Sequence, residues 1–105
     1  MIRPLAALLL LAAPAAAFDG TYGTCGGTGE EAPVRIAGEV ITFYESECRM
    51  TNPVLVRDMP GAVLFDFVCQ GEGESWTERA FVQRTGDGGL ILVWRGLAAT
   101  LPFCG

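Results

Sequence analysis

The sequence predicts an all-β domain: a small antiparallel meander, closed as a barrel or folded as a sandwich and stapled by disulfides. Short runs of β-branched and aromatic residues recur between turns rich in Gly, Asn and Pro. Beyond the first 17 residues, no segment keeps the 3.6-residue period of an amphipathic helix. Four cysteines lie in a chain of only 105 residues, which is typical of small disulfide-bonded exported domains.

Residues 1–17 have the features of a secretory signal peptide. Arg3 supplies a positive charge, a short apolar run follows, and Ala15 and Ala17 are the small residues that precede a cleavage site. The apolar run is shorter than the roughly 20 residues that a membrane span needs. We therefore expect cleavage, no stable membrane insertion afterwards, and one mature domain of residues 18–105 that is periplasmic or secreted.

Alternating apolar residues between turn signals predict the strands one by one. Asn52-Pro53 is predicted to interrupt the strand pattern between residues 49 and 54. The Gly-rich segment 19–33 is predicted to be a loop anchored by Cys25. Phe67 and Trp94 each lie on an apolar strand face and are predicted core residues. The predicted strands cover residues 34–36, 40–49, 54–57, 62–70, 75–84 and 90–95, with a short last strand within 98–104.

The four cysteines, Cys25, Cys48, Cys69 and Cys104, are predicted to form two disulfides. The gaps between them hold 22, 20 and 34 residues and the chain has no histidine, so no metal site and no cofactor is predicted. Four cysteines allow three pairings. We favour Cys48–Cys69 and Cys25–Cys104, because predicted strands ending at Cys48 and Cys69 run the same way in a meander and share a rim. The other bridge would tie the two ends of the domain.

Charge limits the classes of partner. The mature part has twelve acidic residues against six arginines, a net charge of −6, and the chain has no lysine. Such a domain does not bind nucleic acid by neutralising phosphates, and it lacks a basic amphipathic face for anionic lipid. It would attract a cationic protein or envelope component.

Five glutamates are the candidates for a binding rim. If the meander brings Cys48 and Cys69 together, the carboxylates near them meet at one rim. The competing interpretation is a solvated acidic turn, with Arg49 and Arg79 as counter-charges. Two other readings of such a cluster are Ca²⁺ binding, which no EF-hand spacing supports, and general acid–base chemistry. The five are Glu45, Glu47, Glu72, Glu74 and Glu78.

No catalytic constellation is evident. A Ser-His-Asp triad is impossible without histidine, the cysteines are expected to be paired rather than nucleophilic, and no Cys-x-x-Cys redox motif occurs. We therefore predict that the protein is not an enzyme. The alternative is a small envelope hydrolase that uses the carboxylate cluster.

Two segments carry a resemblance. Tyr44-Glu45-Ser46-Glu47-Cys48 is followed by Cys69-Gln70-Gly71-Glu72-Gly73-Glu74-Ser75-Trp76 and by a cysteine near the C-terminus. This pattern resembles a family of small exported four-cysteine β-proteins of alphaproteobacteria. The resemblance implies a periplasmic β-domain with paired cysteines, and it implies no activity and no catalytic residues.

A second, weaker similarity concerns size, charge and compartment only. Small acidic disulfide-bonded β-domains of the periplasm include inhibitors of cationic lysozymes. Those inhibitors carry a Ser-Gly-x-Lys-Tyr loop, which this chain lacks because it has no lysine. The function predicted from sequence is therefore a periplasmic binding or inhibitor-like module whose target the sequence does not name.

Overall fold

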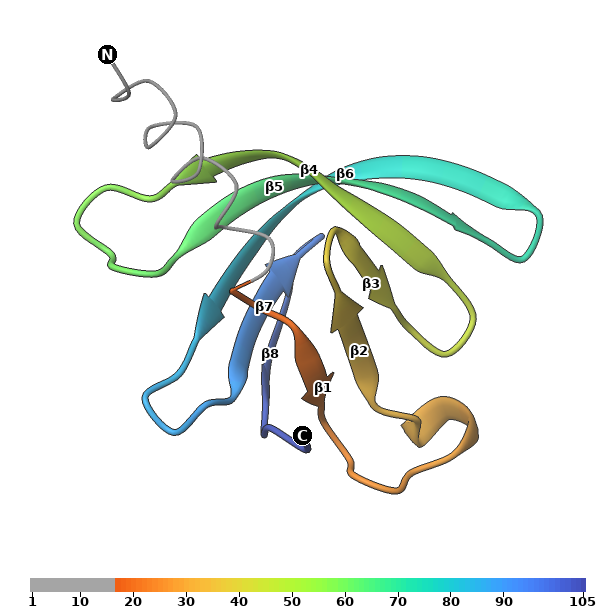
Figure 1. Ribbon diagram of the computed structural model, residues 1–105. Coiled ribbons are helices and arrows are strands. Elements are labelled where there is room, and N and C mark those ends of the chain that lie inside the picture. The colour runs from red at the N-terminus through yellow and green to blue at the C-terminus, as the bar shows by residue number, and fades with distance from the viewer. Residues whose placement is uncertain (1–16) are drawn as a thin grey trace, which may run out of the picture.

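The computed structural model describes residues 17–105, and these form one antiparallel sheet in which each strand pairs with the next along the chain (Figure 1). The sheet curls into a nearly closed barrel, which confirms the all-β prediction and selects the barrel over the sandwich. The strands are β1 (Gly20–Tyr22), β2 (Val34–Ala37), β3 (Val40–Thr42), β4 (Glu47–Leu55), β5 (Val63–Gly71), β6 (Glu74–Arg84), β7 (Leu90–Trp94) and β8 (Leu97–Leu101), with a 3₁₀ turn η1 (Gly29–Glu31) between β1 and β2.

The C-terminal tail closes the barrel against β1. Phe103 forms a β-bridge with Tyr22, the Cys104 amide donates to the Thr21 carbonyl at 2.7 Å, and the Thr21 amide donates to the Gly105 carbonyl at 2.9 Å. The Cys25–Cys104 disulfide covalently joins the same two segments. The prediction that residues 19–33 form a loop is therefore wrong in part. β1 lies within this segment and pairs with the distant C-terminal tail.

The core lies inside the barrel. It is built from the inward-facing members of each strand's alternation, among them Phe65 and Phe67, and no charged side chain is fully buried within residues 17–105. Phe67 is fully buried as predicted, whereas Trp94 is only partly buried and packs at the margin of the core. Phe18, the expected first residue of the mature chain, is also buried, with its ring 6.1 Å from that of Phe65.

The predicted strand 40–49 is wrong, because the chain turns back at residues 43–46 between β3 and β4. The Phe43 amide donates to the Ser46 carbonyl at 2.8 Å and closes this turn. The Phe43 ring then packs 5.7 Å from that of Trp94. Local β-propensity is high here, but the turn lets Phe43 pack against Trp94 at the margin of the core.

The predicted break at Asn52-Pro53 is also wrong, because β4 continues through these residues with a β-bulge. Asn52 adopts a left-handed conformation, with φ 52°, which asparagine tolerates better than most residues. Its side-chain amide donates to Asp66 at 2.9 Å, and Arg79 donates to the other oxygen of that carboxylate at 2.9 Å. These two bonds lower the pKa of Asp66, the Asn52 bond contributing most.

Both disulfides pair as we favoured, but the reason given for Cys48–Cys69 is wrong. Cys48 lies near the start of β4 and Cys69 near the end of β5, and the two face each other directly in the antiparallel register, with Cα atoms 3.9 Å apart. Two disulfides fit a protein outside the cytoplasm.

The predicted signal peptide lies almost wholly outside the described residues. Within residues 17–105, no helix is long and apolar enough to cross a membrane.

Candidate functional site

One end of the barrel collects acidic side chains. The connections β1–β2, β3–β4 and β5–β6 all leave the sheet at this end, since strands of a meander alternate in direction, and they lie on the right in Figure 1. These connections and the strand ends beside them carry six exposed glutamates, which we call the acidic end: Glu30, Glu31, Glu45, Glu47, Glu72 and Glu74. Four of them belong to the predicted rim.

The Cys48–Cys69 disulfide holds two of these connections together. Cys48 lies in β4 just after the β3–β4 turn, and Cys69 lies in β5 just before the β5–β6 turn, so their bond ties the two turns together. Beside it, Glu47 pairs with Gln70 across the strands, and the Gln70 side-chain amide donates to the Glu47 carboxylate at 3.3 Å. The spacing between the two acidic turns is therefore set by covalent and backbone contacts.

Gly71 lets the β3–β4 turn approach the end of β5. A Cβ atom at this position would lie 2.5 Å from the Glu45 carbonyl oxygen and 2.7 Å from the Ser46 Cβ. Only a residue without a side chain fits so close to another backbone segment. The glycine thereby places Glu45 beside the β5–β6 turn.

Gly71→Ala is expected to lower the free energy of unfolding by about 1–3 kcal/mol, because the added methyl group must displace the β3–β4 turn. Gly86→Ala is the matched control, since a Cβ there meets no atom within 4 Å, and it is expected to change stability by less than about 0.5 kcal/mol. Urea unfolding of both variants measures the difference. Equal effects would contradict the close packing at Gly71.

The carboxyl groups of Glu45 and Glu72 interact at the acidic end. The Glu72 carboxyl raises the pKa of Glu45, first by sharing a proton with it and then by charge repulsion; burial and the charge of Glu30 add smaller contributions. The effect of Glu30 shows that η1 contributes to the same electrostatic field. As the pH falls from neutrality, this raised pKa means that Glu45 takes up a proton before an ordinary glutamate would.

Replacing Glu72 with glutamine is expected to move the Glu45 titration to lower pH, toward the ordinary glutamate value of about 4.3. The raised pKa means that the ionised pair opposes folding above it, so the same variant should gain slightly in stability at neutral pH. NMR titration of the carboxyl carbons measures the midpoint. Glu74→Gln is the control, because Glu74 does not contribute to the shift, and an equal effect there would contradict the pairing.

An exposed aromatic ring stands at the acidic end. Tyr44 is 54% exposed, in the β3–β4 turn next to Glu45. A hollow of about 500 Å³ lies between this turn and the β5–β6 hairpin, and its lining includes Tyr44, Glu47 and Glu74. An aromatic face flanked by carboxylates suits an arginine or lysine side chain, since the ring attracts cations as the carboxylates do.

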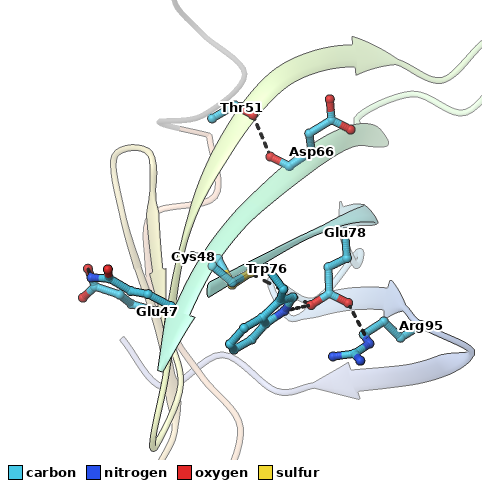
Figure 2. The surroundings of a disulfide bond; sticks show 9 residues. Glu47, Cys48, Thr51, Asp66, Trp76, Glu78 and Arg95 are labelled. Carbon is cyan, nitrogen blue, oxygen red and sulfur yellow. Dashed lines mark hydrogen bonds and ion pairs between the residues drawn. A yellow bond between two sulfur atoms is a disulfide. The ribbon is translucent and has the colours of Figure 1, made fainter. Parts of the chain in front are cut away.

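Glu78 does not join the other predicted rim residues. It lies on the inward face of β6, its side chain is only 10% exposed, and Trp76 Nε1 donates to its Oε2 at 2.7 Å. Arg95 Nε lies 3.5 Å from Oε1, and the Cys69 sulfur lies 4.0 Å from Oε2. Figure 2 shows the carboxylate between the indole of Trp76 and the guanidinium of Arg95. Its role is to tie the β7–β8 turn to β6.

Sequence reasoning missed four residues of this region. Glu30 and Glu31 were assigned to the loop anchored by Cys25 and were not included in the rim. Tyr44 was assigned to a strand and Arg95 to the end of another strand. Nothing in the local sequence places Arg95 near Glu78, although the period-two alternation with Trp76, Ala80 and Val82 would have placed Glu78 inside. Within residues 17–105, no group of three or more acidic, cysteine or histidine side chains is arranged to hold a metal ion.

The two segments that carry the predicted family resemblance form the β3–β4 and β5–β6 turns, which the Cys48–Cys69 bridge joins. The resemblance itself remains a prediction. No family model, no curated protein and no solved structure matches this chain.

Proposed function

We propose that this protein is a non-catalytic binding module, exported to the periplasm or secreted, whose acidic end binds a cationic protein. One observation carries the proposal: six exposed glutamates lie on three neighbouring connections of the barrel. The arginine of the fourth connection at that end, Arg95, has Glu78 as its ion-pair partner. Carboxylates outnumber arginines at this end, since among the arginines of the adjoining strands only Arg35 and Arg49 lie near these connections, and this excess favours encounter with a positively charged surface.

The rigidity of the acidic end supports binding. The disulfide behind it and the close contact at Gly71 hold the two central turns in one arrangement. A surface that is already ordered loses less conformational entropy when a partner docks, so more of the interaction energy appears as affinity. Tyr44 supplies an exposed aromatic side chain, of a type enriched among the residues that dominate binding energy.

Export is part of the proposal. The features of residues 1–17 and the two disulfides support it, since disulfides persist in oxidising compartments. Phe18, the expected first residue of the mature chain, lies in the core, so we expect the mature chain to retain it.

Reversing two charges at the acidic end is expected to weaken binding of basic proteins about tenfold or more at low salt. The variant is Glu72→Lys with Glu74→Lys, and the probes are small basic proteins including a lysozyme. Wild-type association should slow as salt rises, because the Debye length shortens from about 30 Å at 0.01 M to about 8 Å at 0.15 M. Surface plasmon resonance at the two salt concentrations measures both effects.

The matched control reverses two exposed charges at the opposite end, Glu39→Lys with Asp58→Lys. Both double variants change the net charge by the same amount, so the control separates a local effect from an effect of total charge. The proposal fails if the two variants weaken binding equally, or if wild type binds none of the basic probes.

A hydrolase remains the second candidate, because one observation favours it. The raised pKa of Glu45 beside Glu72 is the kind of difference that separates a general acid from its partner carboxylate. A screen of wild type and Glu45→Gln against glycoside and peptide substrates distinguishes the two candidates. Turnover by wild type that Glu45→Gln abolishes would replace the binding proposal with the enzymatic one.

A further inference from the structure

Among the described residues 17–105, half of strand β6 has no strand on its second side. β6 runs over Glu74–Arg84. It pairs with β5 from Glu74 to Val82, whereas β7 pairs only with Ala80–Arg84. Figure 1 shows the β5–β6 hairpin extending well beyond the end of β7 and β8. The segment from Glu74 to Thr77 is therefore an open sheet edge at the acidic end.

The alternation of the ladder decides which backbone groups this edge presents. Glu72 and Gly73 have φ values of 50° and 81°, which is the two-residue turn that makes Gly71 and Glu74 a hydrogen-bonded pair. Bonded and non-bonded pairs then alternate, so Trp76 is bonded to β5 whereas the N–H and C=O groups of Ser75 and Thr77 are directed away from it. A bond on β4 agrees with this alternation. The Met50 amide donates to the Glu39 carbonyl at 2.7 Å and so faces away from β5, which makes Met50 and Phe67 a non-bonded pair and Phe67 and Glu78 a bonded one.

Within residues 17–105, two other stretches of the sheet lack a second partner strand. β8 pairs only with β7 and carries no acidic residue, and the edge of β4 is blunted. β3 pairs with β4 only as far as Arg49, so the remainder of β4 is also uncovered. There the register is interrupted by the bulge between Thr51 and Val54, and Pro53 has no N–H to offer. Bulges and prolines are the usual means by which proteins prevent an edge from pairing. Neither occurs between Glu74 and Thr77.

We propose that the edge of β6 from Glu74 to Thr77 binds an extended segment of a cationic protein by strand addition. This inference rests on the proposed function, since it assigns the binding mode of the same acidic end. Ser75 and Thr77 each exchange two backbone hydrogen bonds with the added strand. The four residues from Glu74 to Thr77 offer about 13 Å of edge, at roughly 3.3 Å per residue. Basic side chains of the added strand lie near Glu72 and Glu74.

Charge selects a basic segment over a second copy of this chain. Pairing two β6 edges would bring two acidic ends together, each with six exposed glutamates, and like charges brought close oppose association. On the inner face, the added residue opposite Trp76 lies beside the half-buried indole. An apolar side chain suits that place, since cross-strand neighbours on one face pack together. Because Glu74 and Trp76 lie on the same face of β6, the expected ligand has an apolar residue and a basic residue two positions apart.

The test uses the capped six-residue peptide Thr-Val-Thr-Lys-Thr-Lys, in which the valine is placed for Trp76 and the next same-face lysine for Glu74, and the same peptide with every backbone amide methylated. Wild-type protein is expected to bind the first peptide and to lose at least tenfold in affinity for the methylated one, which keeps the charges but cannot pair. Hydrogen exchange followed by NMR should show new protection of the Ser75 and Thr77 amides. Unchanged exchange at both amides on saturation with the peptide would overturn the inference.

Thr77→Pro tests the edge from the protein side, because it removes an outward amide that bonds to no other strand. Leu55→Pro is the matched control. The Val56 amide donates to the Ala62 carbonyl, so the Leu55 amide also faces away from β5, but on the blunted edge at the far end. Thr77→Pro is expected to lower the affinity for the unmethylated peptide at least tenfold, and Leu55→Pro to lower it less than twofold. Equal affinities would overturn the inference; if Thr77→Pro does not fold, the peptide pair and the hydrogen exchange decide.

The outcomes separate this inference from the proposed function. If both peptides bind equally and the Glu72/Glu74 reversal weakens both, the acidic end binds cations but strand addition is wrong. If neither peptide binds, strand addition is wrong, and the basic protein probes decide the proposed function independently.

Discussion

Replacing Phe67 with alanine is expected to lower the free energy of unfolding by about 3–5 kcal/mol. The ring is fully buried, and β5 places it at the centre of the sheet between Met50 of β4 and Glu78 of β6. Truncation removes the apolar contacts and leaves a cavity that β5 cannot easily collapse into, since β5 is paired with β4 on one side and β6 on the other.

The control for Phe67→Ala is Val68→Ala on the same strand. Val68 faces outward and is 43% exposed, so its truncation should change stability by about 0.5 kcal/mol or less. Urea unfolding, followed by tryptophan fluorescence, measures both variants. A loss below about 1 kcal/mol for Phe67→Ala would mean that the barrel interior is not packed as described.

Removing the Cys25–Cys104 disulfide is expected to have the second large effect. The bridge spans 79 residues of sequence, and the loop-entropy relation gives about 4–5 kcal/mol of stabilisation for a loop of that length. A domain of this size has a total stability of only about 4–13 kcal/mol. We expect Cys25→Ala with Cys104→Ala to unfold at a much lower temperature, and to lose the β1–tail pairing first.

The comparison variant is Cys48→Ala with Cys69→Ala. That bridge spans 21 residues, and the same relation gives about 3 kcal/mol. Thermal unfolding ranks the two variants, and hydrogen exchange at the Thr21 and Cys104 amides reports on barrel closure. A Cys25/Cys104 variant as stable as wild type would show that the backbone bonds and the Tyr22–Phe103 contact close the barrel without the disulfide.

Local patterns were sufficient for the strands that begin and end at strong turn signals. The turns at Gly71–Glu74 and at Thr85–Gly89 are clear in the sequence, and β5, β6 and β7 lie close to their predicted bounds. Glycine and short polar residues at these places favour positive φ values whatever surrounds them. The alternation between those turns also predicted the burial of Phe67.

The acidic end was predictable only in part. Glu45, Glu47, Glu72 and Glu74 flank two cysteines in the sequence, so a disulfide between those cysteines was enough to bring the four together. Glu30 joins them through η1, which lies in a segment that was predicted to be a loop. The coupling of Glu45 to Glu72 depends on the close approach at Gly71.

The sequence by itself therefore determined the all-β class, the strong turns, the even cysteine count and the excess of negative charge, because composition and short-range conformational preferences set these properties. Only the tertiary structure decided where residues distant in the chain meet: Cys48 opposite Cys69, the tail against β1, and Arg95 beside Glu78. Strand register and barrel closure fix such contacts, and both depend on which side chains fill the common interior. Glu78 illustrates the reason, since a carboxylate on an apolar strand face is tolerated only where another part of the chain brings a cation to it.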